Sequence, residues 1–256
     1  MILGYSTPVT LADTGISYTD TVNTSLAFLK DGRPGALCSL QHTGSSQDID
    51  VSWTAPIRAR VAALINTNLP VGYPVQISLR TGGAYTVQTQ NVQVVETASG
   101  DRCAFVQWDG VAGADGVRFR LNASVASPVT IGELWVSDAL DYCIRSDWSS
   151  AAGVINKTVS LSGAVYTAPA VPRRVVSADI APRRYEDGFE ELRKVSLAVS
   201  DDPRVLIAPD AKDQSALEST AMYARMVANG NVQGDPRGRA FSWAVSAEEM
   251  PGRLPA

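Results

Sequence analysis

Short runs in which apolar and polar residues alternate, separated by glycine or proline, fill most of the first 140 residues. In residues 58–66 every second position is Ala, Val or Ile, and in residues 117–123 Val, Phe and Leu alternate with Arg and Asn. A period of two is typical of a strand with one buried face. Further strands are predicted at residues 75–80, 85–96 and 103–108, with a turn at 98–101. Helix signals are nearly absent here, so the pattern predicts a β-rich fold.

The second part of the chain also contains strand patterns. Strands are expected at residues 173–180, 190–200, 204–208 and 241–246, and in the second of these Val195, Leu197 and Val199 alternate with polar residues. Residues 213–229 remain open between two structures. Residues 215–218 match a helix capping box, whereas every second residue from 220 to 226 follows the period of a strand.

Charge density changes near residue 140. The first 140 residues hold 8 Lys/Arg and 11 Asp/Glu, and the remaining 116 hold 14 and 15. This step predicts a domain boundary. Residues 1–37 are dense in Thr, Ser, Asp and Gly, so we expect an N-terminal extended arm there, followed by a first domain over 38–138 and a second over 139–256. Because termini gain order by lying on other structure, the arm is a candidate for contact with a neighbouring subunit.

The composition of the 256 residues limits the classes of function. Hydrophobic residues make up 45% and charged residues 19%, which is typical of a globular chain and not of a disordered one. The net charge of -4 and the isoelectric point near 5.1 lack the basic character of a protein that neutralises many phosphates. Nucleic acid is therefore not expected as the primary partner.

The cysteines and the N-terminal residues indicate where the chain folds. Cys38, Cys103 and Cys143 show no paired spacing, so we expect buried small side chains and no disulfide framework. The sequence MILGYSTPVT has no basic segment followed by an apolar one, and no stretch of about 18 apolar residues occurs. We expect synthesis and folding in a cytoplasm, without insertion into a membrane.

Residues that could support catalysis are scarce. His42, the single histidine, lies in a Gly/Ser-rich stretch and is expected to be a surface or turn residue. Asp48 and Asp50 lie on one side of a predicted strand, but solvated turns explain them better than a glycosidase pair does. No phosphate-binding loop and no metal-ligand spacing occurs. We therefore expect no enzyme, no metal and no cofactor.

Aromatic side chains are the main candidates for ligand binding. Trp53 and Trp108, together with Tyr73 and Tyr85, could line a sugar-binding face, whereas Trp135 lies in a strand-like run and is expected in the core. Trp53 and Trp108 are the candidate carbohydrate-binding residues.

Two arginine doublets flank a predicted strand of the second part. They are candidates for contacts between subunits, although solvated strand ends explain them equally well. These residues are Arg173, Arg174, Arg183 and Arg184.

A series of short segments follows a recognisable order. Residues 63–70 (ALINTNLP) lead into strand 75–80, and residues 116–121 (GVRFRL) are followed by 129–136 (VTIGELWV). This order resembles tail proteins of tailed bacteriophages that carry a galactose-binding-like jelly roll. The chain departs from that pattern with Asn or Thr where His is frequent, and with Glu133 where Arg is common. Residues 183–185, 196–197 and 241–245 resemble the tail-tube-like domain of the same family, which favours a strand around residues 223–226.

The resemblance implies an all-β protein: a jelly-roll β-sandwich over 38–138 and a tail-tube-like, β-rich assembly domain over 139–256, with at most one or two short helices. It implies a structural virion protein, made in the host cytoplasm, that forms a homo-oligomeric ring at the distal end of the tail. Such rings are commonly hexameric and link the tail tube to tip or fibre proteins. The alternative is a carbohydrate-binding β-sandwich for host-surface glycans.

Overall fold

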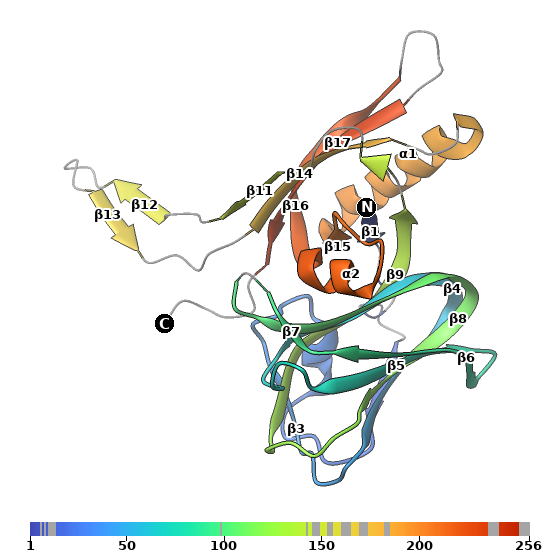
Figure 1. Ribbon diagram of the computed structural model, residues 1–256, viewed down its shortest axis with the longest axis vertical. Helices are drawn as coiled ribbons and strands as arrows, with labels where there is room; N and C mark the ends of the chain where they lie inside the picture. The colour runs from blue at the N-terminus through green and yellow to red at the C-terminus, as the bar shows by residue number, and fades with distance from the viewer. Residues whose placement is uncertain are drawn as a thin grey trace.

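The computed structural model describes residues 1–5, 7, 9, 14–97, 99–141, 143–144, 149–152, 156–159, 165–168, 174–181, 185–234 and 241–250. These residues form a β-sandwich, at the bottom of Figure 1, and a second β unit with two helices above it. All strand pairs in both units are antiparallel. The predicted fold class, a β-sandwich joined to a second β-rich unit, is therefore confirmed.

The sandwich has two layers that share two long strands. The first layer has the strand order β2 (Gly15–Tyr18), β4 (Gln47–Thr67), β8 (Arg102–Leu121), β5 (Pro74–Thr81) and β6 (Ala84–Gln93). The second layer has the order β7 (Val95–Glu96), β8, β4, β9 (Val129–Asp141) and β3 (Cys38–Leu40).

The shared strands β4 and β8 change layer where their pairing is irregular. They pair in register from Gln47 to Ser52 and again from Val61 to Leu64, with register shifts in between. Bulges of this kind bend a strand and increase its twist, which lets one strand serve both layers. The inward side chains of the two layers, among them Ile49 and Phe119, share one hydrophobic core.

The described residues among the first 37 have partners within their own chain. We expected an extended arm ordered by a neighbour, but β1 (Ile2–Tyr5) pairs with β9 on one side and with β15 (Arg204–Ala208) on the other. Strand β2 pairs with β4, and a short 3₁₀ helix (Leu26–Lys30) buries Leu29. The segment is thus part of the sandwich and of its junction with the second unit.

The second unit is a mixed sheet-and-helix assembly. Its strands are β10 (Cys143–Ile144), β11 (Ser149–Ala152), β14 (Arg174–Ala181), β15, β16 (Met222–Gly234) and β17 (Phe241–Glu249), and its helices are α1 (Tyr185–Asp201) and α2 (Gln214–Thr220). The sheet order β10-β14-β17-β16-β15-β1-β9 makes it continuous with the sandwich. Strands β12 (Asn156–Val159) and β13 (Val165–Ala168) form a separate hairpin that projects to the left in Figure 1.

Hydrophobic packing joins the two units face to face as well. Val61, Phe105 and Trp135, on the outer side of the second layer, pack against Leu206 of β15 and Leu217 of α2. This contact explains why Val61–Thr67 of β4 is buried on both sides. Among the described residues this packing covers the outer side of the second layer, whereas side chains on the outer face of the first layer, such as Asp50 and Arg118, stay partly exposed to solvent.

Helix α1 corrects the strand expected over residues 190–200. The side chains it buries against the second sheet are Leu192, Val195 and Val199, at spacings of three and four, while Leu197 is 58% exposed. That spacing follows the period of a helix, and the alternation of Val195, Leu197 and Val199 was misleading.

Residues 213–229 contain both of the structures that the sequence left open. Helix α2 begins after Asp213, whose side chain accepts a hydrogen bond from the backbone nitrogen of Ala216 at 2.9 Å. The N-cap is thus Asp213 and not the capping box that begins at Ser215. After Ala221 the chain continues as β16. This confirms the strand at residues 223–226, which the resemblance to phage tail proteins favoured.

His42 lies in an irregular segment after β3, as expected of a turn residue, but it is not at the surface. It is 4% exposed, and its Nε2 lies 2.8 Å from the carbonyl oxygen of Ala123. Neither helix in the described part of the chain has the length and apolar character needed to cross a bilayer.

Candidate functional site

Ion pairs form a ladder on the open face of the first layer. Asp50 accepts hydrogen bonds from Nε and Nη2 of Arg118 at 2.7 and 3.1 Å. Asp48 accepts hydrogen bonds from Nε and Nη2 of Arg120 at 2.6 and 2.8 Å. The two pairs form because these residues are direct cross-strand partners between β4 and β8.

This ladder settles two expectations about the carboxylates. Asp48 and Asp50 share one side of a strand, as the sequence predicted. The expectation of solvated turns was wrong, because both lie within the sheet and each is held by a two-pronged guanidinium contact. The carboxylates do not face each other across a cleft, which is the arrangement that glycoside hydrolysis requires.

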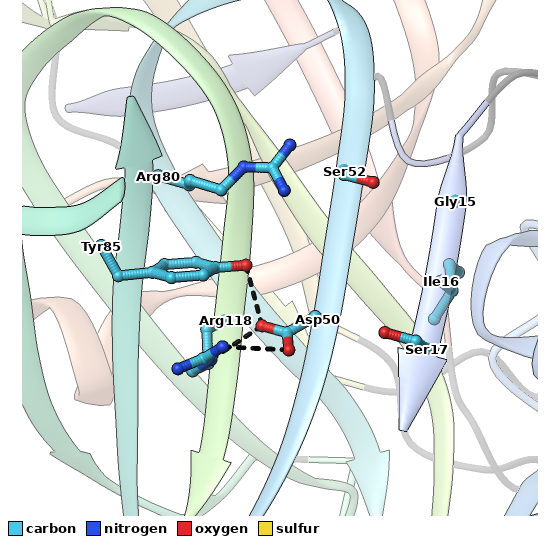
Figure 2. A pocket seen from close by; sticks show the side chains of 8 residues that line it. All are labelled: Gly15, Ile16, Ser17, Asp50, Ser52, Arg80, Tyr85 and Arg118. Carbon is cyan, nitrogen blue, oxygen red and sulfur yellow. Dashed lines mark hydrogen bonds and ion pairs between the residues drawn. The ribbon is translucent and has the colours of Figure 1, made fainter. Parts of the chain in front are cut away.

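A hollow of about 370 Å³ lies over the Asp50–Arg118 pair (Figure 2). Strand β2 forms one wall, and β5 and β6 form the opposite wall. The lining residues are Gly15, Ile16, Ser17, Asp50, Ser52, Arg80, Tyr85 and Arg118.

Tyr85 is fixed from two directions. Its hydroxyl donates a hydrogen bond to Oδ1 of Asp50 at 2.8 Å, and the guanidinium carbon of Arg118 lies 4.1 Å from its ring centroid. The second contact is a cation–π interaction. Asp50, Tyr85 and Arg118 thus form a closed triad, as Figure 2 shows, and each holds the other two in place.

Arg80 reaches the hollow across a glycine. Its Nε and Nη2 donate hydrogen bonds to the side chain and the carbonyl oxygen of Asp115, both at 2.9 Å, and Figure 2 shows the guanidinium directed toward Ser52. A Cβ on Gly116 would lie 2.8 Å from Nε of Arg80 and 2.7 Å from the carbonyl oxygen of Val51. Glycine at position 116 is therefore what lets the arginine cross β8.

The carboxylates and guanidinium groups of the site are charged and paired with one another. Hydrogen bonds from Arg120, reinforced by the charge of Arg118, hold the pKa of Asp48 below its usual range. Burial, with further contributions from Asp50, raises the pKa of Tyr85 to about 12. At neutral pH Tyr85 is thus a hydroxyl group that donates a hydrogen bond. Hydrogen bonds to Asp50 and Asp48 raise the pKa of Arg118 and of Arg120, so both remain cations.

Several hydrogen-bonding groups of the hollow have no partner among the described residues. They are Nη1 of Arg80, Nη1 of Arg118 and the hydroxyls of Ser17 and Ser52. Guanidinium nitrogens donate, and hydroxyls donate and accept. The hollow can therefore hold a small polar ligand through several hydrogen bonds at once.

The two tryptophans predicted to bind carbohydrate lie elsewhere. Trp53 is 4% exposed and Trp108 is 6% exposed, and both belong to the core of the sandwich. The indole nitrogen of Trp53 donates to the carbonyl oxygen of Ala114 at 2.9 Å. Neither ring presents a face to solvent for stacking. Trp135, expected in the core, is fully buried.

Of the arginine doublets, only Arg174 falls within the described residues. It donates hydrogen bonds to Glu249 at 3.1 and 3.2 Å and to the carbonyl oxygen of Ala221 at 2.7 Å. Its side chain is thus engaged within the chain, where it ties β14 to β17. Arg173, Arg183 and Arg184 lie outside the described residues.

The described residues offer no cluster of three or more His, Cys, Asp or Glu side chains suited to a metal ion. Cys38 and Cys103 are free and buried, as predicted. Burial raises the pKa of the Cys103 thiol to about 12, which keeps it protonated at neutral pH.

The fold and the site together define a β-sandwich protein that carries a polar, ligand-sized hollow on its open sheet face. No protein-family model and no curated protein matches the sequence.

Solved structures of carbohydrate-binding modules are similar to about half of the chain. A chitosan-binding module from a Paenibacillus chitosanase/glucanase is 12% identical, with a TM-score of 0.40, over 51% of this chain and 98% of the module. The family 32 module of Clostridium perfringens NanJ, solved with galactose, is 14% identical, with a TM-score of 0.41, over 53% and 99%. The lectin domain of lectinolysin, solved with Lewis b, is 13% identical, with a TM-score of 0.42, over 52% and 97%. Because these identities and TM-scores are low, the fold class is based on the strand order, and no ligand is assigned to this chain from the similarity.

Proposed function

We propose that this protein is a non-catalytic carbohydrate-binding protein and that the hollow over Asp50, Tyr85 and Arg118 holds a sugar residue. The observation that carries the proposal is the set of unpaired donors and hydroxyls around a rigid, mutually hydrogen-bonded triad. Binding sites of this kind place a few polar groups precisely in a concave surface.

The chemistry of the lining suits a polyhydroxylated ligand. A sugar hydroxyl both donates and accepts, so it can accept from Arg80 or Arg118 and donate to Ser17, Ser52 or a carboxylate oxygen. Since the triad is already held by its own contacts, binding costs little side-chain ordering.

A glycan array followed by calorimetry tests the proposal. The critical comparison is Arg118→Gln against Arg120→Gln, because each removes one guanidinium from the same ladder but only Arg118 lines the hollow. We expect Arg118→Gln to weaken sugar binding by roughly tenfold to a hundredfold, as expected for hydrogen bonds to a charged group, and Arg120→Gln to leave it within about threefold. Equal losses in both variants, or no saturable binding to any glycan, would contradict the proposal.

A second candidate function is assembly into a virion ring at the distal end of a phage tail. The observation that favours it is the β12–β13 hairpin, which pairs only with itself among the described strands and projects from the body of the protein (Figure 1). An extension of this kind can reach a neighbouring copy. Head-to-tail contacts between such copies close into rings when the rotation permits.

Light scattering over a concentration series, with electron microscopy of the largest species, tests the assembly. We expect a ring for the full chain and a smaller species when residues 156–168 are replaced by a short Gly/Ser linker. A monomer at every concentration, also in the presence of tail-tube protein, would count against assembly and would leave the sugar proposal unaffected.

A further inference from the structure

Strand β6 forms a free edge of the first layer. It is the last strand in the sheet order and pairs only with β5 among the described strands. Residues along an antiparallel strand direct their N–H and C=O groups alternately to one side and to the other, so every second residue of β6 points these groups away from β5. No backbone hydrogen bond joins them to another described element. The edge therefore offers a row of unpaired donors and acceptors.

The other edge strands of the sandwich are short. Strands β2, β3 and β7 contain four, three and two residues, whereas β6 contains ten. From Gln88 to Gln93 the pairing of β6 with β5 is unbroken, without a bulge that would turn the edge away. The sequence of β6, AYTVQTQNVQ, has no charged residue and no proline. Proteins usually block an open edge by short length, bulges, charges or proline, and this stretch of β6 has none of these features.

The composition of the edge favours a second copy of the same strand as its partner. When two identical strands pair around a two-fold axis, a charged residue near the axis meets its own like charge. Strand β6 brings no such charges together. The exposed side chains near its centre, Thr89, Gln90 and Asn91, each contain groups that donate and groups that accept, so each side chain can hydrogen-bond to its counterpart.

The charged residues beside the edge do not oppose this pairing. Arg60, Asp109 and Lys212 share with two glutamines of β6 the lining of a hollow of about 370 Å³. These residues carry both signs, and Arg60 lies 3.7 Å from Asp138 and Lys212 3.5 Å from Asp210. On the outer face of the first layer, each arginine of the ladder is paired with an aspartate. A second copy approaching the edge therefore meets no strong field of one sign.

We propose that β6 pairs with β6 of a second copy of this chain, antiparallel and around a two-fold axis, so that the first layers of both copies form one continuous sheet. This interface uses the same edge in both copies and therefore closes at a dimer. The axis is perpendicular to the sheet, which keeps both outer faces on one side, so the two hollows over the Asp50–Arg118 pairs face the same way. Only this last consequence, two sugar sites directed at one glycan surface, rests on the proposed function.

Sedimentation at a series of concentrations tests the pairing with two charge variants. Thr89→Lys/Asn91→Lys and Thr89→Glu/Asn91→Glu change exposed side chains near the centre of the edge. We expect the wild type to dimerise, each variant alone to dimerise roughly tenfold more weakly or less, and an equimolar mixture of the two variants to recover the dimer. The matched control is Ala55→Lys/Ala112→Lys, which adds the same charge at exposed positions of β4 and β8, two strands inside the sheet. The control should dimerise as the wild type does.

Amide hydrogen exchange shows whether β6 is the contact. With rising protein concentration, exchange should slow at every second residue of β6, because only those N–H groups face away from β5. A wild type that stays monomeric at every concentration, a mixture that does not recover the dimer, or a dimer whose β6 amides exchange as in the monomer would overturn the proposal.

These measurements are independent of the two functions proposed above. Replacing residues 156–168 by a Gly/Ser linker should leave the β6 dimer intact, which distinguishes it from a ring built through the β12–β13 hairpin. The charge variants should bind a monosaccharide within about twofold of the wild type in calorimetry, because Thr89 and Asn91 do not line the hollow over Asp50. Failure of the sugar proposal would show in the comparison of Arg118→Gln with Arg120→Gln and would leave the sedimentation result unchanged.

Discussion

Replacing Glu133 by glutamine should stabilise the protein above neutral pH and change little in acid. Glu133 lies on β9, fully buried where the sandwich meets the second unit, with Oε1 at 3.5 Å from Nη1 of Arg204. Burial raises the pKa of Glu133 to about 7, and Asp31 and Asp202 add to the rise. Tyr223 and Arg204 act in the opposite direction, but burial has the larger effect.

The size of the effect follows from linkage between proton binding and folding. The pKa of a free glutamate is 4.5, so the folded chain holds this proton more tightly than the unfolded chain. The contribution to stability is full below about pH 4.5 and is lost as the pH rises through about 7. A rise of about 2.5 pKa units corresponds to roughly 3 kcal/mol. Glutamine carries no charge and avoids this loss, while Arg204 keeps Asp202 at 2.6 Å.

Urea unfolding at pH 5 and pH 8 measures the difference. Relative to the wild type, Glu133→Gln should gain roughly 2–3 kcal/mol more at pH 8 than at pH 5. Glu190→Gln on α1 is the control, because that side chain is 78% exposed and should change stability by less than about 0.5 kcal/mol at both pH values. The reasoning is refuted if Glu133→Gln shifts stability equally at both pH values.

Three further outcomes follow from the structure. Gly116→Ala should lower the free energy of unfolding by roughly 2 kcal/mol, measured in urea, and should weaken sugar binding because the new Cβ would lie 2.8 Å from Nε of Arg80; unchanged binding would contradict the role given to Arg80. In a Cys143→Ser variant the two remaining thiols, Cys103 among them, are buried, so a thiol reagent should react only as the chain unfolds; fast reaction in the folded state would contradict this. Leu3→Ala should lower the free energy of unfolding by roughly 2–5 kcal/mol, because Leu3 is fully buried in the core of the second unit. If thermal unfolding shows a loss of less than about 1 kcal/mol, β1 is not packed against that core.

The sequence correctly predicted strands in which one face is buried and the other faces solvent. Residues 204–208 coincide with β15, and the strand predicted at 75–80 lies within β5. Helix α1 was missed because its apolar positions fit two periods, and only the exposure of Leu197 decides between them. The continuity of β4 and β8 was missed because bulges and glycines inside these strands resemble turns between shorter ones.

The candidate site was predictable in its parts but not in its assembly. Asp50 and Tyr85 stood out as a carboxylate and an aromatic residue, and Arg118 as the polar face of a strand. Their meeting depends on the register that sets Asp50 opposite Arg118, which lies 68 residues later in the chain. The burial of Trp53 and Trp108 follows from the bend of β4 and β8, which no local pattern reveals.

The place of β1 has a consequence for the order of folding. Ile2 pairs with Asp141 on one side and with Ala208 on the other, so β1 is synthesised well before either of the strands with which it pairs. Contacts so distant in sequence are slow to form. The sandwich can collapse around its own core before then, but its junction with the second unit closes only when the chain beyond residue 208 is available. Until that moment the outer side of the second layer is uncovered, which makes the period before closure the time when the nascent chain is most exposed to misassembly.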